Sequence, residues 1–549
     1  MNNDSKKLIV FVLISGSILF GFNYFYGPKP KAPDATAVAS QAATVQGTSG
    51  IQTSNSTTLT NDHKKSSTIG STKEKLFKIE NNLAIVSFSN IGGSLSSFKL
   101  KKYNDMKNGK DEQLEMLPAR SVATYLSLYT TGTNLVDSAW VNEGITSNNG
   151  TQTISFSKQL KPGIKIVKEF SIPEDSYTIN TKLKFINKSS TPYAFKDMQY
   201  SWGPNVHYLP GELTRIKSGV GGGFNKVVYK FDKTFKQLTT NLKSKENKII
   251  ALEAIPDWIA VKDLYFTSAL KPLLKVDIKN TVIKDEAGGF VYLGMNLRDM
   301  LVSPGATETI AIDSYIGPAE FHRLKKLGMD KIVDLGGIRF LGVWMFYGLD
   351  YIYTVTKNYG IAILLLTFLI RLILWIPSNS SFKQMKETQS KMAVIKPRME
   401  TLKKIYKDDA QKLNEETMKL YQEYKINPFG GCLPMLLQLP IFIALYGTLI
   451  NVVELKGAKF ALWITDLSQP DKFFILPVFM GITMLIQQKM SAQPSMDGQS
   501  DASQKILLYG MPVFLTYMSF SWPAGLMLYW SISNVLGIAQ QMLVNRSKK

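Results

Sequence analysis

A single arginine, Arg371, stands inside an otherwise apolar stretch that runs from Tyr359 to Pro377. About nineteen helical residues at roughly 1.5 Å each would cover about 28 Å, close to the ~30 Å hydrocarbon core of a bilayer. A charge at that depth is costly and by default marks a functional site that faces a polar cavity. Arg371 is also near the end of the stretch, so its side chain could instead extend to the nearer interface. The stretch alone leaves both interpretations open.

Uncharged polar side chains accompany this arginine in other apolar stretches. Thr367 lies one helical turn before Arg371, so both residues share a helix face. Further along the chain, the apolar stretches contain Gln438, Ser531, Ser533 and Asn534. A complete ion pathway would need several paired charges at depth, and only one charge is present. The pattern instead predicts a hydrated half-cavity that is open to the cytoplasm.

Several familiar chemistries are excluded. The single cysteine, Cys432, rules out an intrachain disulfide. The three histidines, His63, His207 and His322, are too scattered for a histidine-rich metal site and form no HExxH motif. No P-loop or GxSxG motif occurs, and the glycine-rich run at 219–223 lacks the strand-and-helix context of a phosphate loop. We therefore expect no enzymatic activity, no cofactor and no metal.

The first 72 residues divide into two segments. Residues 1–27 contain two lysines followed by a continuous apolar run that is longer than the apolar part of a signal peptide, which predicts an uncleaved signal anchor. Residues 28–72 are rich in Ser, Thr, Ala, Gln and Asn and cannot bury enough apolar surface to offset the entropy of ordering. We expect this second segment to be a flexible tether, with the N-terminus in the cytoplasm by the positive-inside rule.

Residues 73–318 have a strand pattern. Apolar or β-branched residues alternate with polar ones from Tyr177 to Phe185, which is typical of a half-buried strand. Similar runs occur at 83–88, 164–172 and 275–283. Many such strands without intervening helices predict a large antiparallel sandwich. Because the anchor holds the N-terminus in the cytoplasm, we expect this sandwich on the other side of the membrane. A sugar-binding or sugar-modifying sandwich remains an alternative, although acidic and histidine residues do not cluster in it.

The next segments are predicted to be helical. Residues 319–335 favour a helix, and the aromatic-rich residues 338–357 favour an amphipathic helix on the outer membrane surface. We therefore expect 319–358 to form an interfacial region, followed by a transmembrane helix at 359–377. Residues 378–429 are polar and basic. They carry two apolar stripes with alternating spacings of three and four, typical of an antiparallel coiled-coil hairpin, in which Pro397 should kink the first helix. The stripes are Met385, Thr388, Met392, Ile395, Met399, Leu402 and Tyr406, and then Leu413, Thr417, Leu420 and Tyr424.

Four further apolar stretches lie within residues 430–545: 431–453, 473–486, 506–520 and 523–544. The chain carries 64 Lys and Arg against 43 Asp and Glu, a net charge of +21. The basic loops between the stretches and the short basic tail at 546–549 satisfy the positive-inside rule with six spans and both termini in the cytoplasm. Two stretches, 473–486 and 506–520, are shorter than a bilayer core and should thin the membrane locally or draw polar flanking residues inward.

The chain resembles the YidC family of bacterial membrane protein insertases along its whole length. The matching stretches, in the family's order, are NYGIAILLLTFLIRLILWIP, INPFGGCLPMLLQLPIFIALY, FALWITDLS, ILPVFMGITMLIQQKMS and WPAGLMLYWSISN, with WGP at Trp202 and DWIAVKDLYF at Asp257 in the outer domain. The resemblance implies a multi-domain α + β protein. Its parts would be a periplasmic β-supersandwich, a cytoplasmic helical hairpin and a core of five membrane helices around a hydrophilic groove.

The resemblance also implies site residues and partners. Arg371 matches the family's groove arginine, and Thr367, Gln438 and Trp530 match groove positions, although relatives can have Tyr in place of Trp530. Family members receive nascent membrane proteins from ribosomes, act alone or beside the Sec translocon, and work within the lipid bilayer. Because the tail here is short, we expect ribosome contact through the cytoplasmic hairpin, with no direct and specific nucleic-acid binding.

We therefore predict a membrane protein insertase and chaperone of the bacterial inner membrane. A small-solute transporter is the first alternative, and an inverted repeat would favour it, but none is visible. A membrane-anchored periplasmic sugar-binding domain is the second alternative, but it leaves the five C-terminal stretches without a role.

Overall fold

The computed structural model describes residues 73–107, 110–117, 125–203, 226–239, 247–286, 290–406, 409–426, 433–491 and 509–546. The predicted signal anchor and tether, the glycine-rich run 219–223, Cys432 and most of the basic tail lie outside these residues. Residues from Lys73 onward belong to one compact unit.

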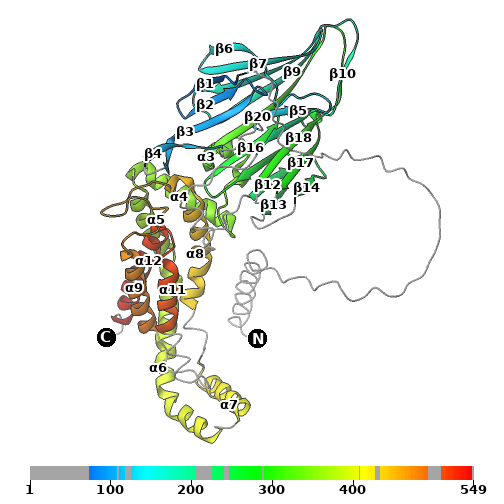
Figure 1. Cartoon of the computed structure of the whole chain (residues 1–549). Helices are drawn as coiled ribbons and strands as arrows, with labels where there is room; N and C mark the ends of the chain where they lie inside the picture. The colour runs from blue at the N-terminus through cyan, green and yellow to red at the C-terminus, as the bar shows by residue number, and fades with distance from the viewer. Residues whose placement is uncertain are drawn as a thin grey trace, which may run out of the picture. The chain divides into compact units, whose positions relative to one another are not determined.

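The first part of the described chain is a β-sandwich in which every strand pair is antiparallel (Figure 1). Its largest sheet has nine strands in the order β13 (Thr234–Thr239), β12 (Lys226–Phe231), β15 (Trp258–Lys262), β16 (Phe266–Pro272), β20 (Thr307–Pro318), β9 (Thr178–Asn187), β8 (Ile164–Pro173), β7 (Thr151–Lys161) and β6 (Val141–Asn148).

Three smaller sheets complete this sandwich. The five-stranded sheet runs β14 (Lys248–Ala251), β17 (Ile278–Glu286), β18 (Phe290–Leu297), β11 (Gln199–Trp202) and β5 (Ser127–Tyr129). The four-stranded sheet runs β1 (Leu76–Glu80), β2 (Ala84–Ser89), β3 (Ser94–Lys107) and β4 (Lys110–Glu115). The third sheet pairs β10 (Tyr193–Phe195) with β19 (Met300–Val302).

The sandwich forms because alternate side chains of its strands point into a common core. In β9, Ile179, Leu183 and Phe185 are buried, whereas Lys182 between them is exposed. Between sheets, the rings of Phe88 and Phe170 stack with centroids 4.8 Å apart. Burying one such ring stabilises the fold by about 1.5–3 kcal/mol. The large antiparallel sandwich predicted from period-two alternation is therefore confirmed.

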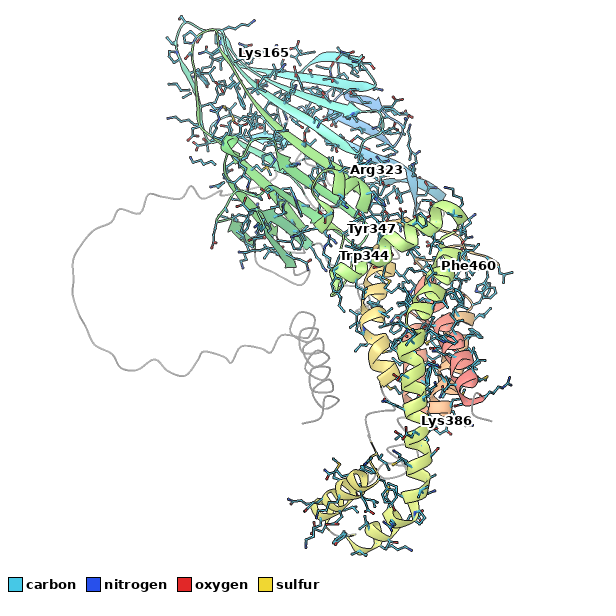
Figure 2. The ribbon with its side chains drawn as sticks, turned by 180° about the vertical axis from the view of Figure 1, so that it is seen from behind. Lys165, Arg323, Trp344, Tyr347, Lys386 and Phe460 are labelled. Atoms are coloured by element: carbon cyan, nitrogen blue, oxygen red, sulfur yellow. The ribbon has the colours of Figure 1, made fainter. Side chains whose placement is uncertain are left out.

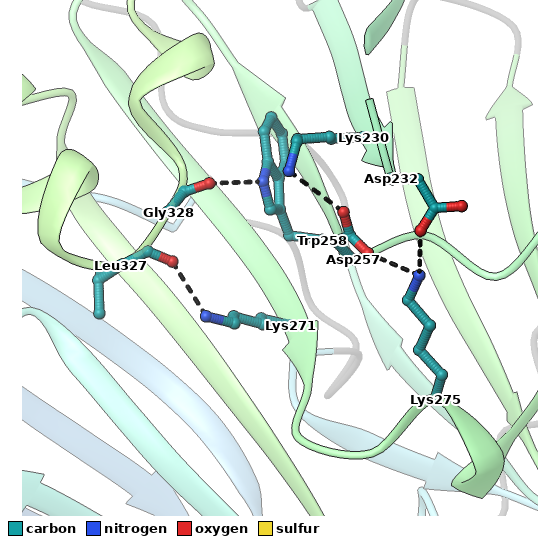
Figure 3. Close-up of polar contacts among 8 residues, drawn as sticks. All are labelled: Lys230, Asp232, Asp257, Trp258, Lys271, Lys275, Leu327 and Gly328. Carbon is teal, nitrogen blue, oxygen red and sulfur yellow. Dashed lines mark hydrogen bonds and ion pairs between the residues drawn. The ribbon is translucent and has the colours of Figure 1, made fainter. Parts of the chain in front are cut away.

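One predicted strand begins later than its sequence pattern suggests. Residues Lys275–Asp277 form the short 3₁₀ helix η1, and β17 begins only at Ile278. The Lys275 ammonium pairs with Asp257 at 2.6 Å and with Asp232 at 3.5 Å (Figure 3). These ion pairs accompany a local turn that the alternation of side chains does not encode.

Residues after the sandwich form two short helical turns instead of the continuous helix expected at 319–335. Helix α3 (Phe321–Lys326) ends before Gly328, whose φ of +73° is a left-handed conformation that terminates helices, and η2 (Asp330–Ile332) follows. Side chains from the nine-stranded sheet bind the carbonyls at this helix end (Figure 3). Trp258 Nε1 donates to Gly328 at 3.1 Å, and Lys271 Nζ donates to Leu327 at 3.0 Å.

Helix α4 (Arg339–Thr356) has two unlike faces. Met345, Phe346 and Leu349 are buried, whereas Phe340, Trp344, Tyr351 and Val355 are more than two-thirds exposed. Trp344 and Tyr347 lie on this helix (Figure 2). The exposed aromatic and aliphatic side chains fit the predicted amphipathic helix, because such side chains favour a membrane interface.

The stretch with Arg371 forms a bent pair of helices. Helix α5 (Tyr359–Ile373) ends four residues before Pro377, and α6 (Trp375–Ile405) starts at a new angle. Proline has no N–H to donate to the carbonyl of Ile373, so the helix can bend there at little cost. The single straight helix expected over 359–377 is therefore wrong in its last turn.

Helices α6 and α7 (Ala410–Glu423) form a hairpin with its own small core. Met392, Ile395 and Met399 of α6 pack with Leu420 and Tyr421 of α7. Met385, which also belongs to the predicted stripe, instead packs on Phe382 and Val544. The seam therefore occupies only part of the stripe.

The last helices are α8 (Leu433–Asn451), α9 (Ile475–Ser491), α11 (Met511–Ser519) and α12 (Ala524–Arg546). Helix α12 packs against α5, α8 and α9, and α11 packs against α9 (Figure 1). Among the described residues, no single helix passes a length-and-hydropathy test for crossing a bilayer, whereas Tyr359–Ile373 and Trp375–Leu402 pass it together, with a bend of 63°.

Candidate functional site

Arg371 reaches across to helix α12. Its Nη2 atom donates to the carbonyl oxygen of Ser533 at 2.6 Å and to the hydroxyl oxygen of Ser533 at 2.7 Å. Gln438 of α8 contacts the same hydroxyl, with Nε2 at 3.0 Å from Ser533 Oγ and at 2.8 Å from Tyr529 Oη. We call Arg371, Gln438, Tyr529 and Ser533 the polar cluster. It joins three helices that are far apart in the sequence.

Helical spacing places the α12 members of this cluster together. Tyr529 and Ser533 are one turn apart, and Gly537 is one turn further, so all three share a face. A Cβ atom on Gly537 would lie 3.4 Å from Arg371 Nη2 and 3.0 Å from Gln487 Nε2. Gly537 therefore lies directly beside the guanidinium group, and an added methyl would press on the Gln487 amide rather than on Arg371.

Among the described residues, no acidic side chain neutralises the charge of Arg371. No salt bridge to Arg371 occurs among the described residues, and its buried Nε atom has no hydrogen-bond partner there. A cation in a medium of low dielectric constant attracts anions much more strongly than it would in water. This arrangement can bind a carboxylate or another hydrogen-bond acceptor, because the Nε–H group of the guanidinium is still an unused donor.

Two of the four predicted site residues lie outside this cluster. The Thr367 hydroxyl is buried and donates at 2.6 Å to the carbonyl of Ile363 in its own helix. The Trp530 ring packs on Phe442, with centroids 4.7 Å apart, and stacks on Trp522 at 5.7 Å. The structure thus brings Arg371 and Gln438 together and places Thr367 and Trp530 in other contacts.

Sequence analysis missed Tyr529 and did not identify Ser533 as the residue at the centre of the cluster. The available signal was the spacing of Tyr529, Ser533 and Gly537, which places two hydroxyl groups and a residue without a side chain on one helix face.

A second polar contact, from Asn534 Nδ2 to Thr483 Oγ1 at 3.2 Å, joins α12 to α9. Within the described ranges, no group of three or more His, Cys, Asp and Glu residues could hold a metal ion.

The described chain therefore belongs to the class of proteins in which a large antiparallel sandwich precedes a bundle of apolar helices, here packed around an arginine. Two family models match in this order: "YidC periplasmic domain" over residues 76–348 and "60Kd inner membrane protein" over residues 351–549. The chain belongs to the YidC family of membrane protein insertases.

Individual relatives agree with this assignment. The chain is 31% identical over 469 residues to a membrane protein insertase YidC of Geobacter sulfurreducens, which covers 84% of each chain. It is 28% identical over 562 residues to a protein of the same name from Syntrophus aciditrophicus, which covers 99% of each. A crystal structure of an active YidC insertase with its first transmembrane domain resolved has 17% sequence identity and a TM-score of 0.36, over 87% of this chain and 94% of that one.

Proposed function

We propose that this protein inserts nascent membrane proteins into the bacterial inner membrane and assists their folding, with the polar cluster as the site that receives the polar part of a substrate. The observation that carries this proposal is the guanidinium of Arg371, which is held by Ser533 between apolar helices and has no acidic partner among the described residues. Family membership favours this function over a small-solute transporter and over a sugar-binding domain.

The mechanism follows from electrostatics and burial. Arg371 attracts the acidic or polar outer segment of a substrate into a groove between α5, α8 and α12. Gln438, Tyr529 and Ser533 provide hydrogen bonds that replace part of the lost hydration. The apolar segment of the substrate then moves sideways into lipid, at a gain of about 25 cal/mol for each Å² of apolar surface removed from water.

The proposed topology has six membrane spans with both termini in the cytoplasm. The spans are the signal anchor in 1–27, the helix at 359–377 and four within 430–545, and the sandwich of 73–318 lies in the periplasm. The helices at 319–358 lie on the outer surface, which the exposed aromatic face of α4 supports. The hairpin of 378–429 projects into the cytoplasm, where its charged surface can contact ribosomes.

Two further features of the proposal concern partners and chemistry. The protein acts alone or beside the Sec translocon, and it acts without a cofactor or a catalysed reaction.

Thr367 and Trp530 line the same groove at positions next to the polar cluster. Thr367 is one turn before Arg371 on α5, and Trp530 is adjacent to Tyr529 on α12.

The test compares two substrates in cells that depend on the variant. Arg371→Ala should reduce protease-protected insertion of a substrate with an acidic outer segment about tenfold, and should reduce insertion of its neutralised variant much less. Arg371→Lys should keep substantial activity, because the charge remains although the planar fork is lost. Equal defects for both substrates at a normal protein level would contradict the proposal, and a lowered protein level would indicate a structural role.

A further inference from the structure

The loop between α8 and α9 binds the start of helix α5. Asn358 caps this helix, with its Oδ1 accepting from the Ile361 amide at 3.1 Å. The other side-chain atom of Asn358, Nδ2, donates to the carbonyl of Phe460 in the loop at 3.0 Å. One side chain thus fixes both the first turn of α5 and the position of the loop beside it.

The ring of Phe460 also lies directly on the backbone of α5. A Cβ atom built on Gly360 would be 2.0 Å from ring atom Cδ2, 2.3 Å from Cγ and 2.7 Å from Cβ of Phe460. Because the contact includes the base of the side chain, rotating the ring cannot relieve such an overlap. Gly360 is therefore required for the approach of this loop, which Figure 2 marks at Phe460.

The same loop binds the start of helix α12. The Gly525 amide donates to the carbonyl of Leu467 at 2.9 Å, and the Ala524 amide donates to the carbonyl of Gln469 at 2.8 Å. These are amides of the first helical turn, which have no partner within the helix itself. The loop carbonyls therefore cap α12 and fix where it begins.

Internal hydrogen bonds make one unit of the two halves of the loop. The Leu467 amide donates to Ala458 at 2.9 Å, and the Phe460 amide donates to Ile464 at 3.1 Å. The part that holds α5 and the part that holds α12 therefore cannot move independently without breaking these bonds. We call residues 458–469 the latch.

We infer that the latch is the positioning element of the polar cluster, and that Asn358 and Phe460 are positioning residues for insertion. Helix α5 carries Arg371 and α12 carries Ser533, and the latch sets the start of both helices relative to each other. A helix transmits a shift at its first turn along its axis, so displacement of the latch moves the guanidinium away from the serine. The insertion readout of this inference rests on the proposed function, whereas its structural readout does not.

The test measures the distance between α5 and α12 in the full-length chain. Spin labels are placed on cysteines introduced at the exposed positions Ile373 and Leu543, in a Cys432→Ser background. Gly360→Ala should move and broaden the measured distance distribution and lower insertion of the acidic substrate about tenfold, because small misplacements of a site are costly. The control is Gly348→Ala in α4, where the added methyl meets only a flexible Leu366 methyl at 3.1 Å.

Two further variants separate the latch from general damage to folding. Asn358→Asp keeps the acceptor that caps α5 but loses the donor to Phe460, so it should shift the distance as well. Adding Phe460→Gly to Gly360→Ala removes the whole overlap, including the contact at 2.7 Å with the Phe460 Cβ atom that an alanine would keep, and should move the distance back toward the wild-type value. Wild-type distances in both Gly360→Ala and Asn358→Asp would overturn the inference, as would a double variant no closer to wild type than Gly360→Ala. If these variants shift the distance but insert the acidic substrate normally, the latch does position the two helices, and the proposed role of the polar cluster in insertion is contradicted.

Discussion

At the scale of single residues, the polar cluster combines a charge with incomplete hydrogen bonding. A buried arginine with all donors satisfied would be a structural anchor. Arg371 instead has two short bonds to Ser533 and an Nε atom without a partner in the described chain. In the proposed function, an incoming carboxylate would satisfy that donor and pair with the charge at the same time.

Ser533 provides a direct test of this arrangement. Ser533→Ala removes the hydroxyl that receives hydrogen bonds from Arg371 and Gln438, and hydrogen bonds to charged groups contribute about 1.5–3 kcal/mol. We expect insertion of an acidic substrate, measured by protease protection, to fall about tenfold. The matched control is Ser531→Ala on the same helix, because Ser531 is equally buried and its hydroxyl has no hydrogen-bond partner among the described residues. Equal effects of the two variants would argue against the cluster.

A second residue-scale prediction concerns the sandwich core. Lys168 of β8 is fully buried, with Nζ 4.8 Å from the centre of the Trp140 ring and 3.4 Å from the carbonyl of Leu126. Burial lowers the pKa of Lys168 to about 7. The folded chain therefore loses this proton at a lower pH than the unfolded chain, whose lysine keeps it up to about pH 10.4.

The sign of the resulting pH dependence follows from linkage. The contribution of Lys168 to stability is fully present above about pH 10 and is lost as the pH falls toward 7, with a slope of about 1.4 kcal/mol per pH unit. Lys168→Met should remove this slope, measured as hydrogen exchange of β8 amides corrected for the intrinsic rate. The control is Lys165→Met, because Lys165 lies on the same strand but its side chain is partly exposed and paired with Glu143. An unchanged slope in Lys168→Met would refute the prediction.

At the scale of secondary-structure elements, the described side chains of the α6–α7 hairpin form a small apolar core. Its core consists of Met392, Ile395, Met399, Leu420, Tyr421 and Ile426. One ion pair, Arg398 with Glu423 at 3.2 Å, joins the two helices at an exposed position and contributes little, about 0.2–1 kcal/mol. The apolar seam therefore determines whether the hairpin keeps its shape.

This small core makes the proposed ribosome contact testable. Leu420→Asp places a charge in the seam and should separate the two helices, because an unpaired buried charge is strongly destabilising. We expect cosedimentation of the purified protein with ribosomes to fall several-fold. Met418→Asp on the same helix adds the same charge at a half-exposed position and should have little effect. If both variants bind ribosomes as the wild type does, the hairpin is not the contact.

At the scale of the whole molecule, the proposed topology separates the sandwich from the hairpin by a membrane. Cysteines introduced at Ser190, in a turn of the sandwich, and at Met418, in the hairpin, are both exposed in the structure. In a Cys432→Ser background with a permeabilised outer membrane, an impermeant thiol reagent should label the first and not the second. Labelling of position 418 before the inner membrane is opened would disprove the six-span arrangement.

Sequence patterns alone predicted the type of the main elements of this protein, although not the bounds of those at 275–283, 319–335 and 359–377. The alternation around Ile179 and Leu183 predicts a strand, and the apolar stretch around Arg371 predicts a helix, because both periods are properties of neighbouring residues. The seam residues Met392, Ile395 and Leu420 are visible for the same reason. Local stereochemistry and side-chain spacing contain enough information for each of these assignments.

Only the tertiary structure decided which of these residues meet. Arg371 and Ser533 are 162 positions apart, and Gly360 meets Phe460, which is 100 positions later in the chain. No local period relates such residues, since their contact depends on how whole helices pack and where the loops hold them. For the same reason Trp530 could not be distinguished from its neighbour Tyr529 in advance: adjacent residues differ by about 100° around a helix, and only packing determines which of them faces the arginine.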